Sequence, residues 1–247
     1  MFGYPARFSN MRYLFYVLRG VRRLQGNSIR RLPRSPITVS HLWLMSGFLA
    51  ASSFSEWNKA MWRCTILTAF FGLLRVSEFI CPSTFDPALH LSPEDITFNR
   101  DYSIMYVKIK ASKTDPFRVG VILRLASINN HALCPVRAMR FYLRFRSTIP
   151  GPLFVFDNGV YLSRAYLAAF LQISLPAVPN INTHSFRIGG ASAALSAGAS
   201  DALIRIMGRW SSDCYNRYIR LTDNSVFDFN EAMSSARPNS TWVSDYV

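Results

Sequence analysis

A histidine and an arginine three residues apart, His184 and Arg187, form the most suggestive spacing in this chain. On a helix, residues at that spacing lie on one face, so both side chains can contact one anion. Thr183 directly precedes them and is a candidate N-cap, which would place that face near the positive end of the helix dipole. A later segment holds Tyr215 and Tyr218 among arginines. A histidine and an arginine on one helix, followed by a tyrosine, indicate chemistry on a phosphate group.

A second charged pair, Arg75 and Glu78, has the same spacing and follows a broadly apolar stretch at 56–74. Taken alone, such a pair usually forms a solvated salt bridge worth roughly 0.3–0.5 kcal/mol. An arginine at the end of a buried helix, however, must either extend to solvent or serve a site. The position of Arg75 therefore makes it a candidate for the same phosphate-directed chemistry.

Other kinds of phosphate chemistry need motifs that this sequence lacks. It contains no Walker loop, no group of acids spaced to hold two metal ions, and no Gly-x-Ser-x-Gly elbow. The residues present suit phosphoryl transfer without a metal, with a protein side chain as the nucleophile. We therefore expect no metal, no ATP and no organic cofactor.

The charge of the chain favours a polyanionic partner. Twenty-eight Lys and Arg residues against 14 Asp and Glu give a net charge of +14. Such an excess attracts nucleic acid through steering and counterion release, although charge that merely keeps a protein soluble is the alternative. The first 55 residues contain no acid, which strengthens the nucleic-acid interpretation. Their basic residues are Arg7, Arg12, Arg19, Arg22, Arg23, Arg30, Arg31 and Arg34.

The cysteines and the apolar stretches indicate a protein that is neither secreted nor membrane-bound. The four cysteines are far apart and form no Cys-x-x-Cys pair, which favours free thiols in a reducing compartment. Arginines interrupt the N-terminal segment, so it does not resemble a signal peptide. We expect no membrane span, because no apolar run is long enough.

The hydrophobic pattern predicts a mostly α domain with a small antiparallel β-sheet, an α+β class. Half of the residues are hydrophobic and 14% are aromatic, enough for a sizeable core. Candidate helices span residues 11–24, 38–52, 56–74, 135–146, 163–173, 189–197 and 201–207. Candidate strands span residues 95–98, 103–110 and 118–125, with a further short strand at 151–156.

Three segments together resemble a known family. His184-Ser-Phe-Arg187, Gly208-Arg-Trp210 and Arg217-Tyr218-Ile-Arg are similar to the second signature box of tyrosine recombinases, the phage integrase family. Leu74-Arg75-Val-Ser77-Glu78 is similar to the first box of that family. The sequences of these motifs are most similar to those of recombinases from eukaryotic mobile elements of the Crypton and DIRS kind. The resemblance covers about residues 35–230 and implies the DNA breaking–rejoining fold of the catalytic domain.

The resemblance assigns roles to the residues around the phosphate. It implies that Arg75 and Arg187 bind the non-bridging oxygens, with Glu78 supporting the site. His184 would add a hydrogen bond and help to move the proton of the nucleophile. Trp210 takes the place often held by a second histidine, where its indole N–H can donate to a phosphate oxygen.

The same resemblance names the nucleophile and the acid. Tyr218 would attack phosphorus to give a 3′-phosphotyrosine, and Tyr215 is the alternative, because Tyr218 lies one residue nearer to Trp210 than in bacterial and phage members. The family carries its catalytic lysine on a hairpin in the phrase Ser-Lys-Thr, which here contains Lys113. Most turn lysines are merely solvated, and Lys108 and Lys110 are the alternatives if the register differs.

The predicted partner is double-stranded DNA, with self-association into a tetramer on DNA implied by the resemblance. We expect a catalytic domain at 35–230 and a C-terminal tail at 231–247. Residues 1–34 would be the helix and basic linker that remain of a missing or truncated N-terminal core-binding domain. Localisation would be nuclear in a eukaryote and otherwise cytoplasmic or at the nucleoid. The predicted DNA-contacting residues are Arg22, Arg23, Arg30, Arg31, Arg34 and Arg209.

The expected function is therefore site-specific DNA recombination or integration. Two other functions remain open: a catalytically silent DNA-binding remnant of a mobile element, and a type IB topoisomerase-like enzyme. The presence of every expected catalytic residue argues against a silent remnant. The recombinase-like sequence around Trp210 argues against a topoisomerase-like enzyme.

Overall fold

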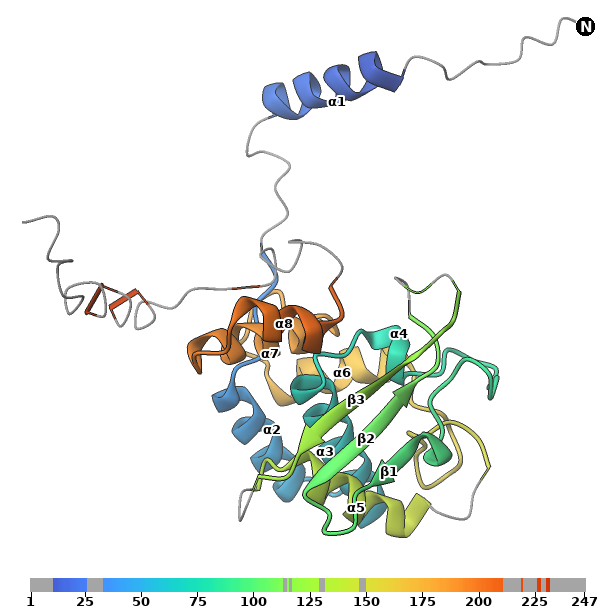
Figure 1. Ribbon diagram of the computed structural model, residues 1–247. Helices are drawn as coiled ribbons and strands as arrows, with labels where there is room; N and C mark the ends of the chain where they lie inside the picture. Colours follow the sequence, from blue (N-terminus) through green and yellow to red (C-terminus); the bar gives the residue numbers. More distant parts are fainter. Residues whose placement is uncertain are drawn as a thin grey trace, which may run out of the picture. The chain divides into compact units, whose positions relative to one another are not determined.

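The computed structural model describes residues 11–25, 33–112, 115, 117–128, 132–146, 150–210, 219, 226–227 and 230–231. It divides the chain into two compact units, residues 1–33 and residues 34–247. In the first unit the described residues include one helix, α1 (Met11–Gln25), drawn in Figure 1. Apolar side chains such as Leu24 are exposed on α1, and so is Arg23. The helix predicted at 11–24 is therefore present.

The second unit is built around α3 (Glu56–Phe71), as its broadly apolar sequence predicted. Most of its side chains are buried, because neighbouring helices pack around it. These neighbours are α2 (Val39–Ala51), α5 (Pro135–Arg146) and α7 (Ser185–Ser196). The hydroxyl of Ser55 caps the N-terminus of α3. The core is thus centred on a helix whose C-terminal end leads directly to Arg75.

A three-stranded antiparallel sheet covers part of this helical core. Its order is β1 (Ile96–Phe98), β2 (Ile104–Ile109) and β3 (Val121–Ala126), and β3 contacts α5 (Figure 1). Alternate side chains of β2 face the core, which is the period-two pattern read from the sequence. The buried residues of β2 are Met105, Val107 and Ile109.

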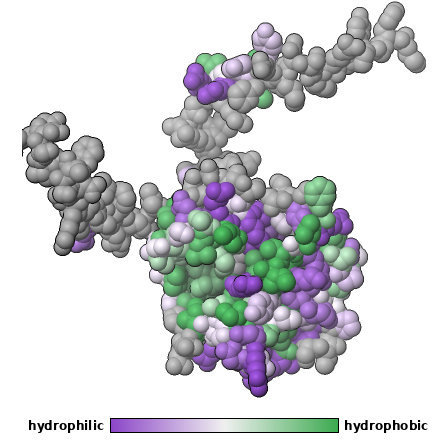
Figure 2. All heavy atoms as spheres, in the orientation of Figure 1, coloured by the Kyte–Doolittle hydropathy of each residue, from purple (hydrophilic) through white to green (hydrophobic). Residues whose placement is uncertain are grey.

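The remaining elements lie between and after these layers. They are α4 (Val76–Phe79), the short 3₁₀ helix η2 (Pro93–Asp95), α6 (Arg164–Ser174) and α8 (Asp201–Gly208). On the face of the molecule shown in Figure 2, hydrophobic and hydrophilic side chains are interspersed. No helix among the described residues combines the length and the apolar character needed to cross a membrane.

Two glycines allow α7 to approach the core more closely than any other residue type would. A Cβ at Gly189 would overlap the carbonyl group of Ile37, and a Cβ at Gly190 would overlap the carbonyl oxygen of Phe70 in α3. The Ile37 N–H also donates to the Ser185 carbonyl at 3.0 Å. This close packing brings the N-terminus of α7 next to the C-terminal end of α3.

Two local expectations were wrong. The chain at 151–156 is not a strand among the described residues, since it contributes only an isolated bridge between Val155 and Tyr161. Thr183 is not the N-cap of α7, because His184 occupies that position. The Asn182 side-chain oxygen accepts the His184 N–H at 2.8 Å, so an Asx-type turn leads into the helix instead.

Candidate active site

Arg75 and Glu78 form a doubly bonded pair at the end of the core helix. The Arg75 Nη1 donates to Glu78 Oε1 at 2.9 Å, and the Arg75 backbone N–H donates to Glu78 Oε2 at 2.8 Å. The same Nη1 donates to Ser112 Oγ at 3.1 Å. The Arg75 side chain is 14% exposed, whereas that of Glu78 is fully buried. The buried carboxylate thus orients an arginine that still reaches the surface.

Arg187 is completely buried beside this pair. Its Nη1 donates to the carbonyl of Leu73 and its Nη2 to the carbonyl of Gly208. Its guanidinium carbon lies 4.1 Å from the centre of the Trp210 ring, a cation–π contact. Leu73 has a φ of 49°, which non-glycine residues adopt rarely and usually where the surrounding contacts require it. Two distant segments, at Leu73 and at residues 208–210, therefore hold Arg187 in place.

Trp210 packs between Arg187 and a small group of apolar side chains. It is 6% exposed and belongs to a small apolar cluster with Leu73, Ala191 and Ile204. Its ring face is occupied by Arg187, so the structure gives it a packing role. A hydrogen bond from its indole to a phosphate stays a prediction.

Arg209, which the sequence predicted to contact DNA, is directed towards the protein interior, and its contact with DNA stays a prediction. Its backbone is left-handed, with φ 57° and ψ 46°, and its side chain is only 9% exposed. One guanidinium nitrogen donates to Glu78 Oε2 at 2.7 Å and to the Leu73 carbonyl at 3.1 Å. The other donates to the carbonyls of Gly72 and Met207. Arg209 is turned inward because the buried Glu78 needs a second cation, and it acts as a brace between α8 and the Arg75 segment.

Glu78 is the electrostatic centre of the site. Burial by itself raises the pKa of this carboxyl, but the surrounding positive groups outweigh it, so that the pKa lies below its ordinary value. The lowering comes from the charge of Arg209, then from the backbone hydrogen bond and the charge of Arg75, and last from Arg187. Glu78 is therefore an anion that neutralises part of a concentrated positive charge.

His184 is the N-cap residue of α7, the helix that carries Arg187 and packs against α3. Burial is the largest cause that lowers the pKa of its imidazole, and nearby positive charges add to it, giving a pKa of about 4. The histidine is consequently neutral near pH 7 and can accept a proton. The contributing charges belong to Arg34, Arg187, Arg75 and Arg164.

Lys113 lies outside the described residues, but the residues that flank its turn are described. Ser112 and Asp115 form an isolated antiparallel bridge, and Ser112 contacts Arg75. Of the alternative lysines, Lys110 is held by Asp95, with 2.6 Å between Nζ and Oδ2. Lys108 is exposed on β2. The Lys110 ammonium also donates to the His90 carbonyl and to Ser92 Oγ, each at 3.2 Å.

Tyr215 and Tyr218 also lie outside the described residues, as does the segment 232–247 of the predicted tail. The residue after Tyr218 is described. Ile219 packs against the apolar cluster that contains Leu73 and Trp210. That packing brings the chain at position 219 back to the base of the site.

The predicted basic residues fall into three groups. Arg34 is exposed, and its charge acts on His184, while Arg23 is exposed on α1. The side chain of Arg22 and the whole of Arg30 and Arg31 lie outside the described residues. Arg209 is the buried brace described above.

Several contacts of the candidate site were not predicted from the sequence. Arg164 carries no motif signal, and Ser112 belongs to the phrase Ser-Lys-Thr but received no role of its own. Two backbone carbonyls cannot be read from side-chain identities at all. A cavity of about 390 Å³ lies beside Arg209 and Trp210 and is also lined by Ser112 and Asp115 from the hairpin. Among the described residues, no group of three or more His, Cys, Asp or Glu side chains is placed to hold a metal ion.

Comparison with known proteins identifies the fold. No protein-family model matches the sequence, and no curated protein matches it. Solved structures do match. The XerH site-specific recombinase, bound to a palindromic difH substrate in a post-cleavage complex, aligns with a TM-score of 0.59 and 18% identity, over 83% of this chain and 54% of that one. This chain has the fold of a tyrosine recombinase catalytic domain.

Two further structures agree. The Tn1549 transposon integrase (residues 82–397), in complex with circular intermediate DNA, aligns with a TM-score of 0.57 and 14% identity, over 91% of this chain and 77% of that one. A lambda integrase dimer bound to a COC′ core site aligns with a TM-score of 0.53 and 16% identity, over 86% of this chain and 57% of that one. The prediction of a mostly helical domain with a small antiparallel sheet is confirmed. The chain spans little more than half the length of XerH.

Proposed function

We propose that this chain is the catalytic domain of a site-specific DNA recombinase that cleaves and rejoins DNA through a 3′-phosphotyrosine. The observation that carries the proposal is the convergence of Arg75, His184 and Arg187. Arg187 donates to the carbonyl of Leu73, which lies 114 positions earlier in the chain and just before Arg75. The charges of Arg187 and Arg75 both lower the pKa of His184. The neutral imidazole is a weak base among the arginines, and the negative charge of a bound phosphate would raise its pKa and so its ability to take a proton.

The proposed reaction includes two proton transfers, one from the nucleophile and one to the leaving group. The Tyr218 oxygen attacks phosphorus while its proton passes to the neutral His184, and the bond from phosphorus to the 5′ oxygen breaks. Lys113 donates a proton to the departing 5′ oxygen. The phosphotyrosine keeps the energy of the broken bond, so rejoining by a 5′ hydroxyl needs no ATP, and the proposal includes no metal and no organic cofactor.

The two arginines contribute in different ways. Arg75 is partly exposed and oriented by Glu78, so it binds a non-bridging oxygen directly. Arg187 is fully buried, so its contact with the phosphate requires side chains over it to move when DNA binds. Until then it contributes positive charge behind the phosphate site, which favours the extra negative charge of the transition state.

The described neighbours of Lys113 and Tyr218 support the assignments that the resemblance implies. Ser112 contacts Arg75, which supports an approach of the hairpin to the phosphate site. Ile219 packs on the cluster that holds Trp210, which supports an approach of residue 218. Trp210 packs against Arg187, and we propose that its indole N–H also donates to a phosphate oxygen, as the resemblance implies.

Charge and the structural relatives support the proposed substrate, and the family resemblance supports the proposed assembly. A net charge of +14 and the exposed Arg23 and Arg34 favour duplex DNA, and the XerH and Tn1549 structures contain DNA. We propose self-association on DNA, and an origin in a eukaryotic mobile element of the Crypton or DIRS kind. The support for that origin is the wording His184-Ser-Phe-Arg187 and Gly208-Arg-Trp210.

Trapping of a covalent complex tests the proposal. Nicked duplexes of randomised sequence, whose cleavage releases a short end that diffuses away, should form an SDS-resistant complex with the full chain. Tyr218→Phe should form none, whereas Tyr215→Phe should behave as the wild type, and mass spectrometry of the trapped peptide should locate the phosphate on residue 218.

Three outcomes would change the conclusion. Trapping by Tyr218→Phe but not by Tyr215→Phe would move the nucleophile to Tyr215. Relaxation of supercoiled plasmid without strand exchange between sites would indicate topoisomerase-like activity. Tight DNA binding with no covalent complex under any condition would indicate a silent DNA-binding remnant.

A further inference from the structure

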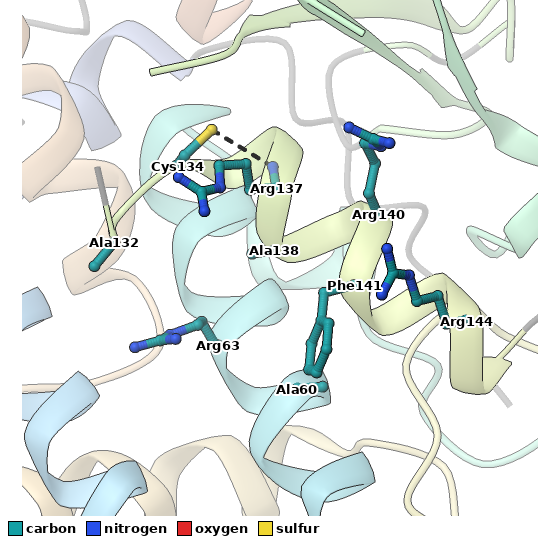
Figure 3. A pocket seen from close by; sticks show the side chains of 9 residues that line it. All are labelled: Ala60, Arg63, Ala132, Cys134, Arg137, Ala138, Arg140, Phe141 and Arg144. Carbon is teal, nitrogen blue, oxygen red and sulfur yellow. Dashed lines mark hydrogen bonds between the residues drawn. The ribbon is translucent and has the colours of Figure 1, made fainter. Parts of the chain in front are cut away.

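A cavity lined by arginines lies between α3 and α5, away from the candidate active site. Its volume is about 370 Å³. Arg63 comes from α3, and Arg137, Arg140 and Arg144 come from α5 (Figure 3). The three arginines of α5 are exposed, and Arg63 is half-buried.

The positive charge of this cavity is not neutralised from within. None of the described residues that line it is acidic, and no ion pair between described residues includes its arginines. Glu56 lines an adjacent cavity together with Arg63, but its carboxylate pairs with Lys59 Nζ at 3.1 Å. The protein thus concentrates charge here without supplying the counter-ion that Glu78 supplies in the active site.

The arrangement fits an extended anion better than a single one. Arg137, Arg140 and Arg144 lie along one stripe of α5, over about 10.5 Å of helix axis at 1.5 Å per residue. In Figure 3, Arg63 and Arg137 extend to the same side of the cavity, while Arg140 and Arg144 lie further along α5. Two groups of guanidinium donors in succession match a chain of phosphates rather than one phosphate.

Two contacts give the cavity a defined form. The Arg140 guanidinium carbon lies 3.9 Å from the centre of the Tyr102 ring, and the Arg137 backbone N–H donates to Cys134 Sγ at 3.5 Å. Phe141 lies between the arginine groups and offers an apolar surface on which a sugar can pack. An alternation of charged and apolar surface is what a sugar–phosphate backbone presents.

The cavity is separate from the phosphate site of the proposed reaction. From Arg63 to the end of α3 at Phe71 is about 12 Å along the helix axis, and Arg75 lies beyond that end. Figure 1 shows α5 and α8 at opposite ends of the unit formed by residues 34–247. One phosphate cannot contact both sites.

We propose that this arginine-lined cavity binds the phosphodiester backbone of a second DNA duplex while the first occupies the candidate active site. The choice of DNA as the polyanion and the first duplex in the candidate active site both rest on the proposed function. Arginine forks pair with phosphate oxygens, and the release of counterions from DNA drives the association. Each copy of this chain carries a charge of +14, so the cavity matches a polyanion better than it matches the surface of a second copy.

A bridging assay tests the second site. Beads carrying a biotinylated duplex are saturated with the full chain, and retention of a second, fluorescent duplex is measured. Arg137→Glu/Arg144→Glu should retain at least about tenfold less of the second duplex, because two cations that bind phosphates become anions that repel them. Arg124→Glu, on an exposed arginine of β3 that does not line the cavity, should retain it as the wild type does.

Parallel measurements make the result decisive. Thermal melting should show that both variants fold, and covalent trapping on a single nicked duplex should be unchanged. Wild-type bridging by the double variant would overturn the second site. So would a weaker affinity for one long duplex with bridging unchanged, because the cavity would then bind the flank of the first duplex.

The assay also separates this proposal from the others. Competition by polyglutamate as effective as that by a duplex of equal charge would assign the cavity to an acidic protein and overturn the proposal. A wild-type chain that bridges duplexes but traps no covalent complex would contradict the recombinase function alone.

Discussion

The two arginine clusters of this domain show how burial changes what an arginine does. In the candidate active site, Arg187 and Arg209 are buried, bonded to backbone carbonyls and balanced by Glu78. Along α5, Arg137 and Arg144 are exposed, and no described ion pair includes them. Buried charge must be paired, so its geometry is specified, whereas exposed charge acts through the field that it creates. The first cluster is suited to catalysis and the second to attraction of a polyanion.

Removal of the counter-ion from the buried cluster should have the largest effect. Glu78→Ala leaves Arg75 and Arg209 without their carboxylate, and the removal of one partner from a buried ion pair costs about 3–5 kcal/mol. Urea unfolding measures that cost. Glu56→Ala is the matched control, because Glu56 is 71% exposed in its pair with Lys59, and it should cost only about 0.2–1 kcal/mol. Equal costs for the two variants would contradict the contrast between buried and exposed charge.

Arg187→Ala should affect catalysis most among the arginines. Removal of a group that stabilises the transition state lowers the cleavage rate by about 10²–10³-fold, equivalent to about 2.7–4 kcal/mol. Single-turnover trapping on nicked duplexes gives that rate. Arg187→Lys keeps the charge but not the fork that bonds the carbonyls of Leu73 and Gly208, so it should recover little of the activity. Cleavage at the wild-type rate by Arg187→Ala would remove Arg187 from the mechanism.

His184 should give the buried site a pH dependence that the exposed cluster lacks. The pKa of its imidazole is about 4 in the folded chain and ordinarily 6.5, so between these values the unfolded state binds more protons. The contribution of His184 to stability is therefore complete above about pH 6.5 and is lost as the pH falls towards about 4. Unfolding free energies measured across this range should fall more steeply for the wild type than for His184→Gln. Parallel curves for the two proteins would show that the imidazole is not shielded.

The exposed cluster should show the smallest effect on stability. Arg144→Ala removes an exposed side chain that no described ion pair includes, so the free energy of unfolding should change by no more than about 0.5 kcal/mol. Its effect should appear instead in DNA binding, where the slope of log K against log salt falls by about 0.9 for each phosphate that the protein no longer neutralises. Stability lowered as much as by Glu78→Ala would mean that Arg144 is structural.

Much of the fold could be predicted because local patterns reflect it. The predicted helix at 135–146 has the observed bounds of α5, and the alternation at 103–110 predicted β2. The strand expected at 151–156 was wrong. In that segment the carbonyls of Pro152 and Leu153 accept hydrogen bonds from the buried Arg146, an interaction that the local sequence does not reveal.

Less of the site could be predicted, because its contacts join distant segments. The spacing of Arg75 and Glu78 indicated their pairing, since residues three apart on a helical turn lie together. Nothing in the phrase Gly208-Arg-Trp210 shows that Arg209 turns inward, because that depends on a left-handed backbone and on a carboxylate 131 positions away. Thr183 has the side chain of a cap, but His184 occupies the N-cap position, and the Asn182 side chain accepts the His184 N–H.

The sequence by itself determined the elements, the basic character of the chain and the residue types available for chemistry at a phosphate. Periodicity, charge and short motifs are local properties, and they can be read without coordinates. The tertiary structure alone decided which arginines are buried and paired and which remain open to a partner. It did so because the desolvation of a charge depends on what packs around it. Around Arg187 that packing includes the close approach of α7 to the backbone at Ile37 and Phe70, which two glycines allow.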